Sequence, residues 1–171
     1  LDVSKTVISR FTAEKVYNES LKWAEKYDKE LEDMLKGNKE YALKVFGIER
    51  GNKKPRKDIS KWSDVKNEIS YMYDEKFNNQ NINYEYQKIS NSDKIKTILE
   101  EYINNYFDEK DDKQQWFDKI KDLSGKLGYA SEVKEFKANP DKYEAHVGDV
   151  STVLRIALTG RTNTPDMYEI M

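Results

Sequence analysis

Cysteine is absent from this chain, and histidine occurs once, at position 146. Without a thiol, the chain has no disulfide framework, no cysteine nucleophile and no cysteine ligands for zinc or an iron–sulfur cluster. A single His146 also excludes sites that need two histidines, such as the H-E-x-x-H zinc motif. We therefore expect no metal site and no thiol chemistry within the chain.

Long apolar runs and turn-forming residues are also scarce. No segment approaches the roughly 18 consecutive apolar residues of a membrane-spanning helix, and residues 1–16 contain no apolar stretch typical of a signal peptide. We therefore expect a cytoplasmic protein that makes no membrane contact. The 171 residues include seven glycines and three prolines, too few for an all-β protein with many turns. The composition thus favours helices.

Apolar residues recur at three- and four-residue spacing along most of the chain, as they do in amphipathic helices. One long helix is predicted to begin after an N-cap at Thr12 and to end at Gly37. A helix capped by Ser63 is predicted to run to Phe77, followed by an Asn-rich loop over residues 78–83. Further helices are predicted around residues 41–46, 92–106, 116–127, 131–136, 149–158 and from Thr164-Pro165 onward.

The predicted fold class is all-α, a helical bundle or superhelical module in two parts. Because the Asn-rich loop is the best candidate for a boundary, we expect a division into residues 1–90 and residues 91–171. The last predicted helix stops after about two turns, a length that is marginal in water. We therefore expect the second part to be truncated at its C-terminus.

The clearest shift in composition is a basic run in the loop predicted after residue 49. The net charge of the chain is −2, so a contact with nucleic acid has to come from such a local patch. Clustered lysines and arginines displace condensed counterions and hold the phosphates of a nucleic-acid backbone. The alternative is a solvated surface loop, which is common for charge runs. The run contains Arg50, Lys53, Lys54, Arg56, Lys57 and Lys61, interrupted by Asp58.

A second candidate site follows the predicted helix over residues 149–158. Arg155 lies on a mixed face of this otherwise apolar helix, where a guanidinium can read base edges or phosphates. It can equally pair with a carboxylate such as Asp149 or Glu169. The helix start predicted at Thr164-Pro165 presents free backbone amides to an anion or a base edge, or else is a simple cap.

Motifs for catalysis are missing. His146 has no partner in the sequence, so a surface or structural position is expected for it. Residues 108–112 lack the alternating ligands and the central glycine of an EF-hand loop, and no Gly-rich nucleotide-binding loop occurs. We therefore expect no catalytic residue in this chain. A binding module remains, for nucleic acid or, as a helical adaptor, for a protein partner.

Both ends of the chain contain a recognisable pattern. Residues 154–160 read L-R-I-A-L-T-G, and residues 164–167 read T-P-D-M. This combination resembles the C-terminal anticodon-binding region of bacterial glutamyl-tRNA synthetases. Residues 2–10, 21–24 and 53–65 resemble the longer bacterial form of the same enzymes. The resemblance thus spans both ends of the chain.

The resemblance implies a class I ligase that uses ATP and Mg²⁺ to attach glutamate to tRNA(Glu) through a glutamyl-adenylate. The nucleotide-binding domain would precede Leu1, because the paired-histidine motif and the K-M-S-K-S-like loop of that domain are absent here. This fragment would then be a non-catalytic monomer that grips the anticodon arm of tRNA(Glu). A ligase strict for glutamate tRNA and one that also charges glutamine tRNA both remain open.

The resemblance also assigns candidate contacts to individual residues. Met167 stands where the family usually has leucine, a change that keeps an apolar surface for packing against a base. The candidates for contacts with anticodon bases are Arg155, Thr164, Pro165 and Met167. The candidates for contacts with phosphates are Arg50, Lys53, Lys54, Arg56, Lys57 and Arg161.

Overall fold

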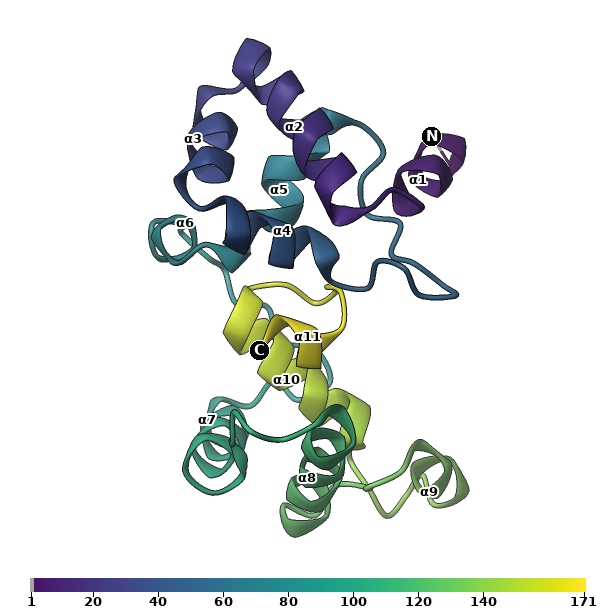
Figure 1. Cartoon of the computed structure of the whole chain (residues 1–171). Coiled ribbons are helices and arrows are strands. Elements are labelled where there is room, and N and C mark those ends of the chain that lie inside the picture. Colours follow the sequence, from purple (N-terminus) through teal and green to yellow (C-terminus); the bar gives the residue numbers. More distant parts are fainter. Residues whose placement is uncertain (1) are drawn as a thin grey trace. The chain divides into compact units, whose positions relative to one another are not determined.

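The computed structural model describes residues 2–171, with side chains from residue 3 onward, and confirms the all-α prediction (Figure 1). Within this range no strand forms, and Ala130 and His146 make an isolated parallel bridge. The α-helices are α1 (Asp2–Ser9), α2 (Ala13–Tyr27), α3 (Lys29–Gly37), α4 (Lys39–Gly47), α5 (Val65–Ile69), α6 (Asp74–Asn78), α7 (Ser92–Glu101), α8 (Lys113–Lys126), α9 (Val133–Ala138), α10 (Val147–Thr159) and α11 (Met167–Ile170). Over the described range, no helix combines the length and the apolar character that crossing a bilayer requires.

Backbone contacts group the chain into two compact units. The first unit consists of residues 1–80 together with 165–171, and the second consists of residues 81–164. Residues 81–90 and 165–171 are therefore grouped differently from the predicted parts, 1–90 and 91–171. The superhelical arrangement of the parts stays a prediction.

The prediction of one continuous helix from Thr12 to Gly37 is wrong, although Thr12 caps α2 as expected. The backbone of Asp28 is extended, and its Oδ1 accepts a hydrogen bond from the Leu31 amide at 3.0 Å. Its Oδ2 lies 2.8 Å from Lys66 Nζ. Burial acts to raise the pKa of this carboxyl, but the bonds from Lys66 and Leu31 outweigh it and leave the pKa below its usual value. Capping by Asp28 therefore ends α2 and starts α3.

The single helix predicted from Ser63 to Phe77 is also wrong. The structure has a 3₁₀ turn at Trp62–Asp64, then α5, a second 3₁₀ turn at Ser70–Met72, and α6. Asp64 Oδ2 accepts hydrogen bonds from the amides of Ser60 and Lys61, so the turn begins one residue before Ser63.

The core of the first unit is formed by α2–α5, and its largest fully buried side chains are Phe46, Leu31, Leu35, Ile59, Ile69, Val16 and Val65.

The second unit packs α10 against α7 and α8. The helix predicted over residues 92–106 is α-helical only as far as Glu101, because residues Tyr102–Tyr106 form a π-helical turn. The wider turn shifts the register of the following side chains. Tyr102 is buried and its hydroxyl accepts a hydrogen bond from Trp116 Nε1 at 3.0 Å, whereas the neighbouring Ile103 is 67% exposed.

A candidate nucleic-acid interface

Helix α10 is held at both ends by features of its own sequence. At the start, His146 Nδ1 accepts a hydrogen bond from the Gly148 amide, and the Asp149 carboxylate accepts one from the His146 amide, each at 3.0 Å. His146 is therefore a structural cap, and α10 begins at Val147, two residues before the predicted start at residue 149. At the end, Gly160 has φ +67°, in the left-handed region that favours glycine.

Arg155 is half-buried on α10 and makes no ion pair among residues 2–171. Its Nε is buried and lacks a hydrogen-bond partner in the described part of the chain. The two carboxylates that the sequence offered as partners are engaged elsewhere. Asp149 binds the His146 amide, and Glu169 Oε2 accepts a hydrogen bond from the Glu49 amide. No carboxylate among the described residues therefore neutralises the Arg155 guanidinium.

The helix that follows the Gly160 turn begins later than predicted. Asp166 Oδ1 accepts a hydrogen bond from the Glu169 amide, so α11 starts at Met167 and not at Thr164-Pro165. Thr164 and Pro165 are half-buried. Met167 is only 4% exposed. A contact between Met167 and a base therefore requires a shift of this segment.

The two arginines of the basic run lie inside the loop. Arg56 is 7% exposed, donates from Nη2 to the Val45 carbonyl oxygen at 3.3 Å, and places Nε 3.1 Å from Asp58 Oδ2. Arg50 donates from Nη1 to the Ile8 carbonyl oxygen at 3.1 Å. Burial, with a smaller effect of the Arg56 charge, lowers the pKa of Arg50 to about 10. Both side chains therefore hold the loop against the first unit.

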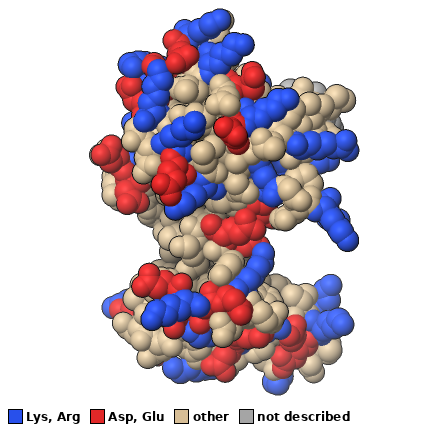
Figure 2. All heavy atoms as spheres, viewed as in Figure 1, with Lys and Arg blue, Asp and Glu red and all other residues tan. Residues whose placement is uncertain are grey.

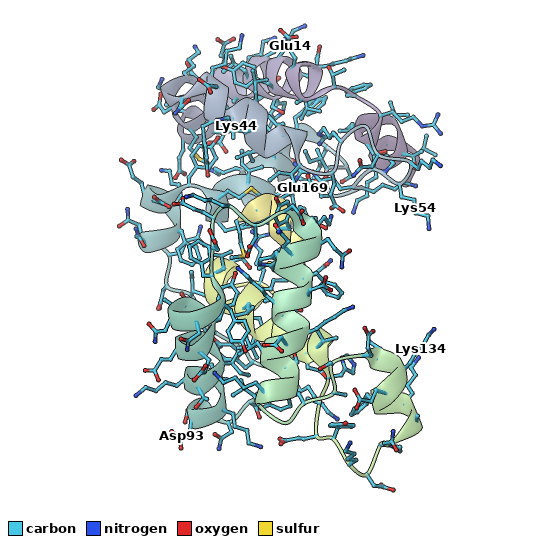
Figure 3. All side chains as sticks on the ribbon, turned by 60° about the horizontal axis from the view of Figure 1, so that its bottom comes forward. Glu14, Lys44, Lys54, Asp93, Lys134 and Glu169 are labelled. Atoms are coloured by element: carbon cyan, nitrogen blue, oxygen red, sulfur yellow. The ribbon has the colours of Figure 1, made fainter. Side chains whose placement is uncertain are left out.

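Three exposed lysines of the run line a cavity of about 630 Å³, which we call the basic groove, whereas Lys61 lies outside it and its Nζ is 3.9 Å from Asp64 Oδ1. Lys53, Lys54 and Lys57 form one side, and Arg10, just after α1, contributes a fourth cation. In the part of the chain with described side chains, the rest of the lining is uncharged: Thr6, Ser9, Gly51, Asn52 and Pro55. Figure 2 shows blue side chains gathered over α1 and the loop after α4, and Figure 3 shows Lys54 projecting from that loop.

The cations of the basic groove differ from the lysines of the first unit that form ion pairs. Lys36 Nζ lies 2.8 Å from a Glu32 carboxylate oxygen, and this bond is the main cause of its raised pKa. By contrast, none of the four cations of the groove is paired with a carboxylate among the described side chains. Unpaired cations of one sign that share a concave surface concentrate a positive potential there. The groove is thus suited to an anion that makes several contacts.

Only some of the residues predicted to contact phosphates line the basic groove. The groove unites Lys53, Lys54 and Lys57 and adds Arg10, which the sequence reasoning did not single out because it lies some forty positions earlier in the chain. Arg161 is not among the lining residues; it follows the Gly160 turn in the second unit and is half-buried. Among residues 2–171, no three histidine, aspartate or glutamate side chains are grouped so that they could hold a metal ion.

Comparison with known proteins confirms the resemblance seen in the sequence. The chain is 42% identical over 169 residues to a glutamate–tRNA ligase of Acetivibrio thermocellus, 39% over 169 residues to one of Sorangium cellulosum, and 40% over 171 residues to one of Clostridium perfringens. Each match covers 99% of this chain but only 30%, 29% and 31% of the respective relative. The chain therefore spans less than a third of the length of these curated relatives. No family model matches the chain, and no solved structure matches it significantly.

Proposed function

We propose that this chain, similar over 99% of its length to a segment of bacterial glutamate–tRNA ligases, is a tRNA-binding portion that grips the anticodon arm of tRNA(Glu). The main support from the structure is the basic groove, where cations from two separate segments converge without a paired carboxylate among the described side chains. The phosphates of an RNA backbone are the anions that such a groove fits, because they follow one another along a strand.

In this proposal the lysines and the arginines of the basic run have different roles. Lys53, Lys54 and Lys57 contact phosphates from the exposed side of the loop, together with Arg10. Arg50 and Arg56 act from inside, because their bonds to the carbonyl oxygens of Ile8 and Val45 keep the loop in place. A loop that is ordered before binding loses less conformational entropy when RNA arrives.

Base recognition is assigned to the end of α10 and the segment after it. Arg155, with its unpartnered Nε, is the candidate for a bidentate contact with an anticodon base. Thr164 and Pro165 are accessible enough to touch a base, and Met167 contributes only if the segment moves. Arg161 provides a further phosphate contact near this end. These roles follow the resemblance, and the lack of a neutralising carboxylate for Arg155 among the described residues supports them.

For the whole protein we propose a cytoplasmic, monomeric glutamate–tRNA ligase that uses ATP and Mg²⁺. The residues described here do not fit those cofactors, since they offer no cluster of metal ligands and no Gly-rich phosphate loop. We therefore place the ATP chemistry in the part of the relatives that this chain does not cover, and we assign no catalytic residue to it. A test for glutamylation by this chain alone checks that assignment, and activity would contradict it.

The alternative function is a helical adaptor for a protein partner. Two exposed apolar side chains of the second unit, Ile103 and Phe107, are the surface features that favour it. Binding to a protein through apolar side chains depends weakly on salt, whereas phosphate contacts produce a steep dependence. Salt dependence therefore separates the two functions.

The deciding experiment titrates tRNA(Glu) and an anticodon-altered tRNA against this chain at several salt concentrations. Three variants are compared with the parent: Lys53/Lys54/Lys57→Gln, Arg155→Ala, and a control in which exposed lysines outside the groove, Lys22/Lys26/Lys44, become Gln. Loss of three phosphate contacts is expected to make the slope of log K against log salt shallower by about 2 to 3. An equal effect of the control triple variant would refute the assignment of the groove.

A further inference from the structure

The carboxylate of Glu169 in α11 accepts a hydrogen bond at 2.7 Å from the backbone amide of Glu49, 120 positions earlier in the chain. Glu49 has φ +56°, a left-handed conformation that non-glycine residues adopt rarely. It directly precedes Arg50 and the loop that carries the groove lysines. From this contact we propose that Glu169 is a positioning residue for the basic groove, a proposal that rests on the proposed function.

The contact is connected to both sides of the groove. After Glu49, the Arg50 amide donates to the Gly47 carbonyl oxygen at 2.9 Å, which closes a tight turn. The Arg50 side chain reaches the Ile8 carbonyl oxygen, two residues before Arg10. The turn that Glu169 binds therefore ties the lysine side of the groove to the end of α1, which provides the Arg10 side.

Glu169 is itself held in place by its own short helix. Asp166 Oδ1 accepts a hydrogen bond from the Glu169 amide at 3.2 Å, and the next side chain, Ile170, packs against the core of the first unit. Because the backbone of Glu169 is already fixed, only side-chain entropy is lost when its carboxylate binds the Glu49 amide. The segment that includes Pro165 and Met167, two proposed anticodon contacts, thus also stabilises the turn before the phosphate contacts.

Electrostatics and positioning predict opposite effects of removing Glu169. An acidic side chain in the unit that holds phosphates repels RNA, so loss of its charge alone should strengthen binding slightly. Loss of its hydrogen bond should loosen the turn at Glu49 and spread the groove cations, which weakens binding. The Gln variant separates the two effects, because its amide oxygen still accepts the bond while the charge is gone.

The experiment measures tRNA(Glu) affinity and the salt slope for this chain and its Glu169 variants. Glu169→Ala should bind about fivefold more weakly, the effect of losing one net hydrogen bond. Glu169→Gln should bind as tightly as the parent or slightly more tightly. Glu169→Asp, which keeps the charge but is one methylene too short, should resemble Ala. Glu14→Ala, an exposed acidic position in the first turn of α2, is the matched charge control and should not weaken binding.

Two further measurements distinguish positioning from general destabilisation. The amide of Glu49 should exchange with solvent faster in Glu169→Ala than in Glu169→Gln. In the Lys53/Lys54/Lys57→Gln background, Glu169→Ala should have little further effect, because both changes act on the same groove. Should Glu169→Ala fold poorly, the comparison of Asp with Gln provides the same test.

The outcomes separate the two proposals. If the lysine variant flattens the salt slope but Glu169→Ala and Glu169→Asp bind like Glu169→Gln, the positioning role of Glu169 is wrong and the proposed function stands. If the parent binds tRNA no better than the lysine variant does, both proposals are overturned.

Discussion

Replacement of Gly160 by alanine tests how α10, the helix that carries Arg155, is terminated. Gly160 has φ +67°, and a left-handed conformation costs a non-glycine residue roughly 1–2 kcal/mol. A Cβ at this position would also lie 2.7 Å from Ile82 Cγ2, closer than two carbon atoms can approach without a shift. Overpacking of this kind costs about 1–3 kcal/mol. We expect Gly160→Ala to reduce the free energy of unfolding of the second unit by about 2–5 kcal/mol.

The two contributions can be separated with a double-mutant cycle. Ile82→Ala removes the methyl groups that the new Cβ would meet, so it should recover the packing part of the loss but not the conformational part. The conformational part of the loss in unfolding free energy should be smaller for Gly160→Asn than for Gly160→Ala, because asparagine tolerates the left-handed region. Urea dependence of hydrogen exchange at the α10 amides reports on this unit specifically.

The same variants connect stability to base recognition. Arg155 lies five residues before Gly160, in the last two turns of α10, so a frayed helix end should reduce discrimination between tRNA(Glu) and the anticodon-altered tRNA. If Gly160→Ala lowers the free energy of unfolding by less than about 1 kcal/mol, or if Ile82→Ala restores none of the loss, then backbone conformation and the contact with Ile82 do not restrict this position to glycine.

Three further predictions concern side chains with defined partners. Arg155→Ala should lose about 1–3 kcal/mol of discrimination against the altered anticodon in tRNA titrations, and Arg155→Lys should not restore it because lysine lacks the bidentate fork. Arg56→Met leaves Asp58 half-buried and unpaired, and it should lower the free energy of unfolding of the first unit by about 3 kcal/mol in urea titrations. Adding Asp58→Asn to this variant should recover much of that loss. The pKa of Asp28 is lowered in the folded state, so its stabilising effect is present above the unfolded pKa of about 3.9 and is lost as the pH falls through the folded pKa. Asp28→Asn should therefore reduce the loss of unfolding free energy between neutral and acidic pH, as measured by urea titrations. An unchanged loss in this variant would refute the role of Asp28.

The helices that depend on local sequence were predicted well. Thr12 caps α2, and the amphipathic spacing around residues 116–127 and 131–136 corresponds to α8 and α9. The prediction of one long helix after Thr12 failed because a side chain in its middle caps a new helix and also contacts a partner distant in sequence. Asp28 breaks the first long helix, and one of its carboxylate oxygens contacts Lys66, a partner that no local pattern indicates.

The candidate site was predicted only in part. The basic run after residue 49 was visible in the composition, but its members could not be divided into buried and exposed cations. Arg56 and Lys57 are neighbours in the sequence, yet one is enclosed by Val45 and Asp58 and the other lines the groove. That difference depends on which side of the loop faces the core, which the backbone path alone decides.

The sequence by itself determined the helical class, the lack of thiol chemistry, the resemblance to glutamate–tRNA ligases and the positions of the main basic residues, because composition, spacing and local motifs are properties of neighbouring residues. Only the tertiary structure brought Arg10 to the groove lysines and Glu169 to the amide of Glu49. Contacts between positions 40 to 120 residues apart depend on how the helices pack, so they follow from the burial of the whole core and not from any short stretch of sequence.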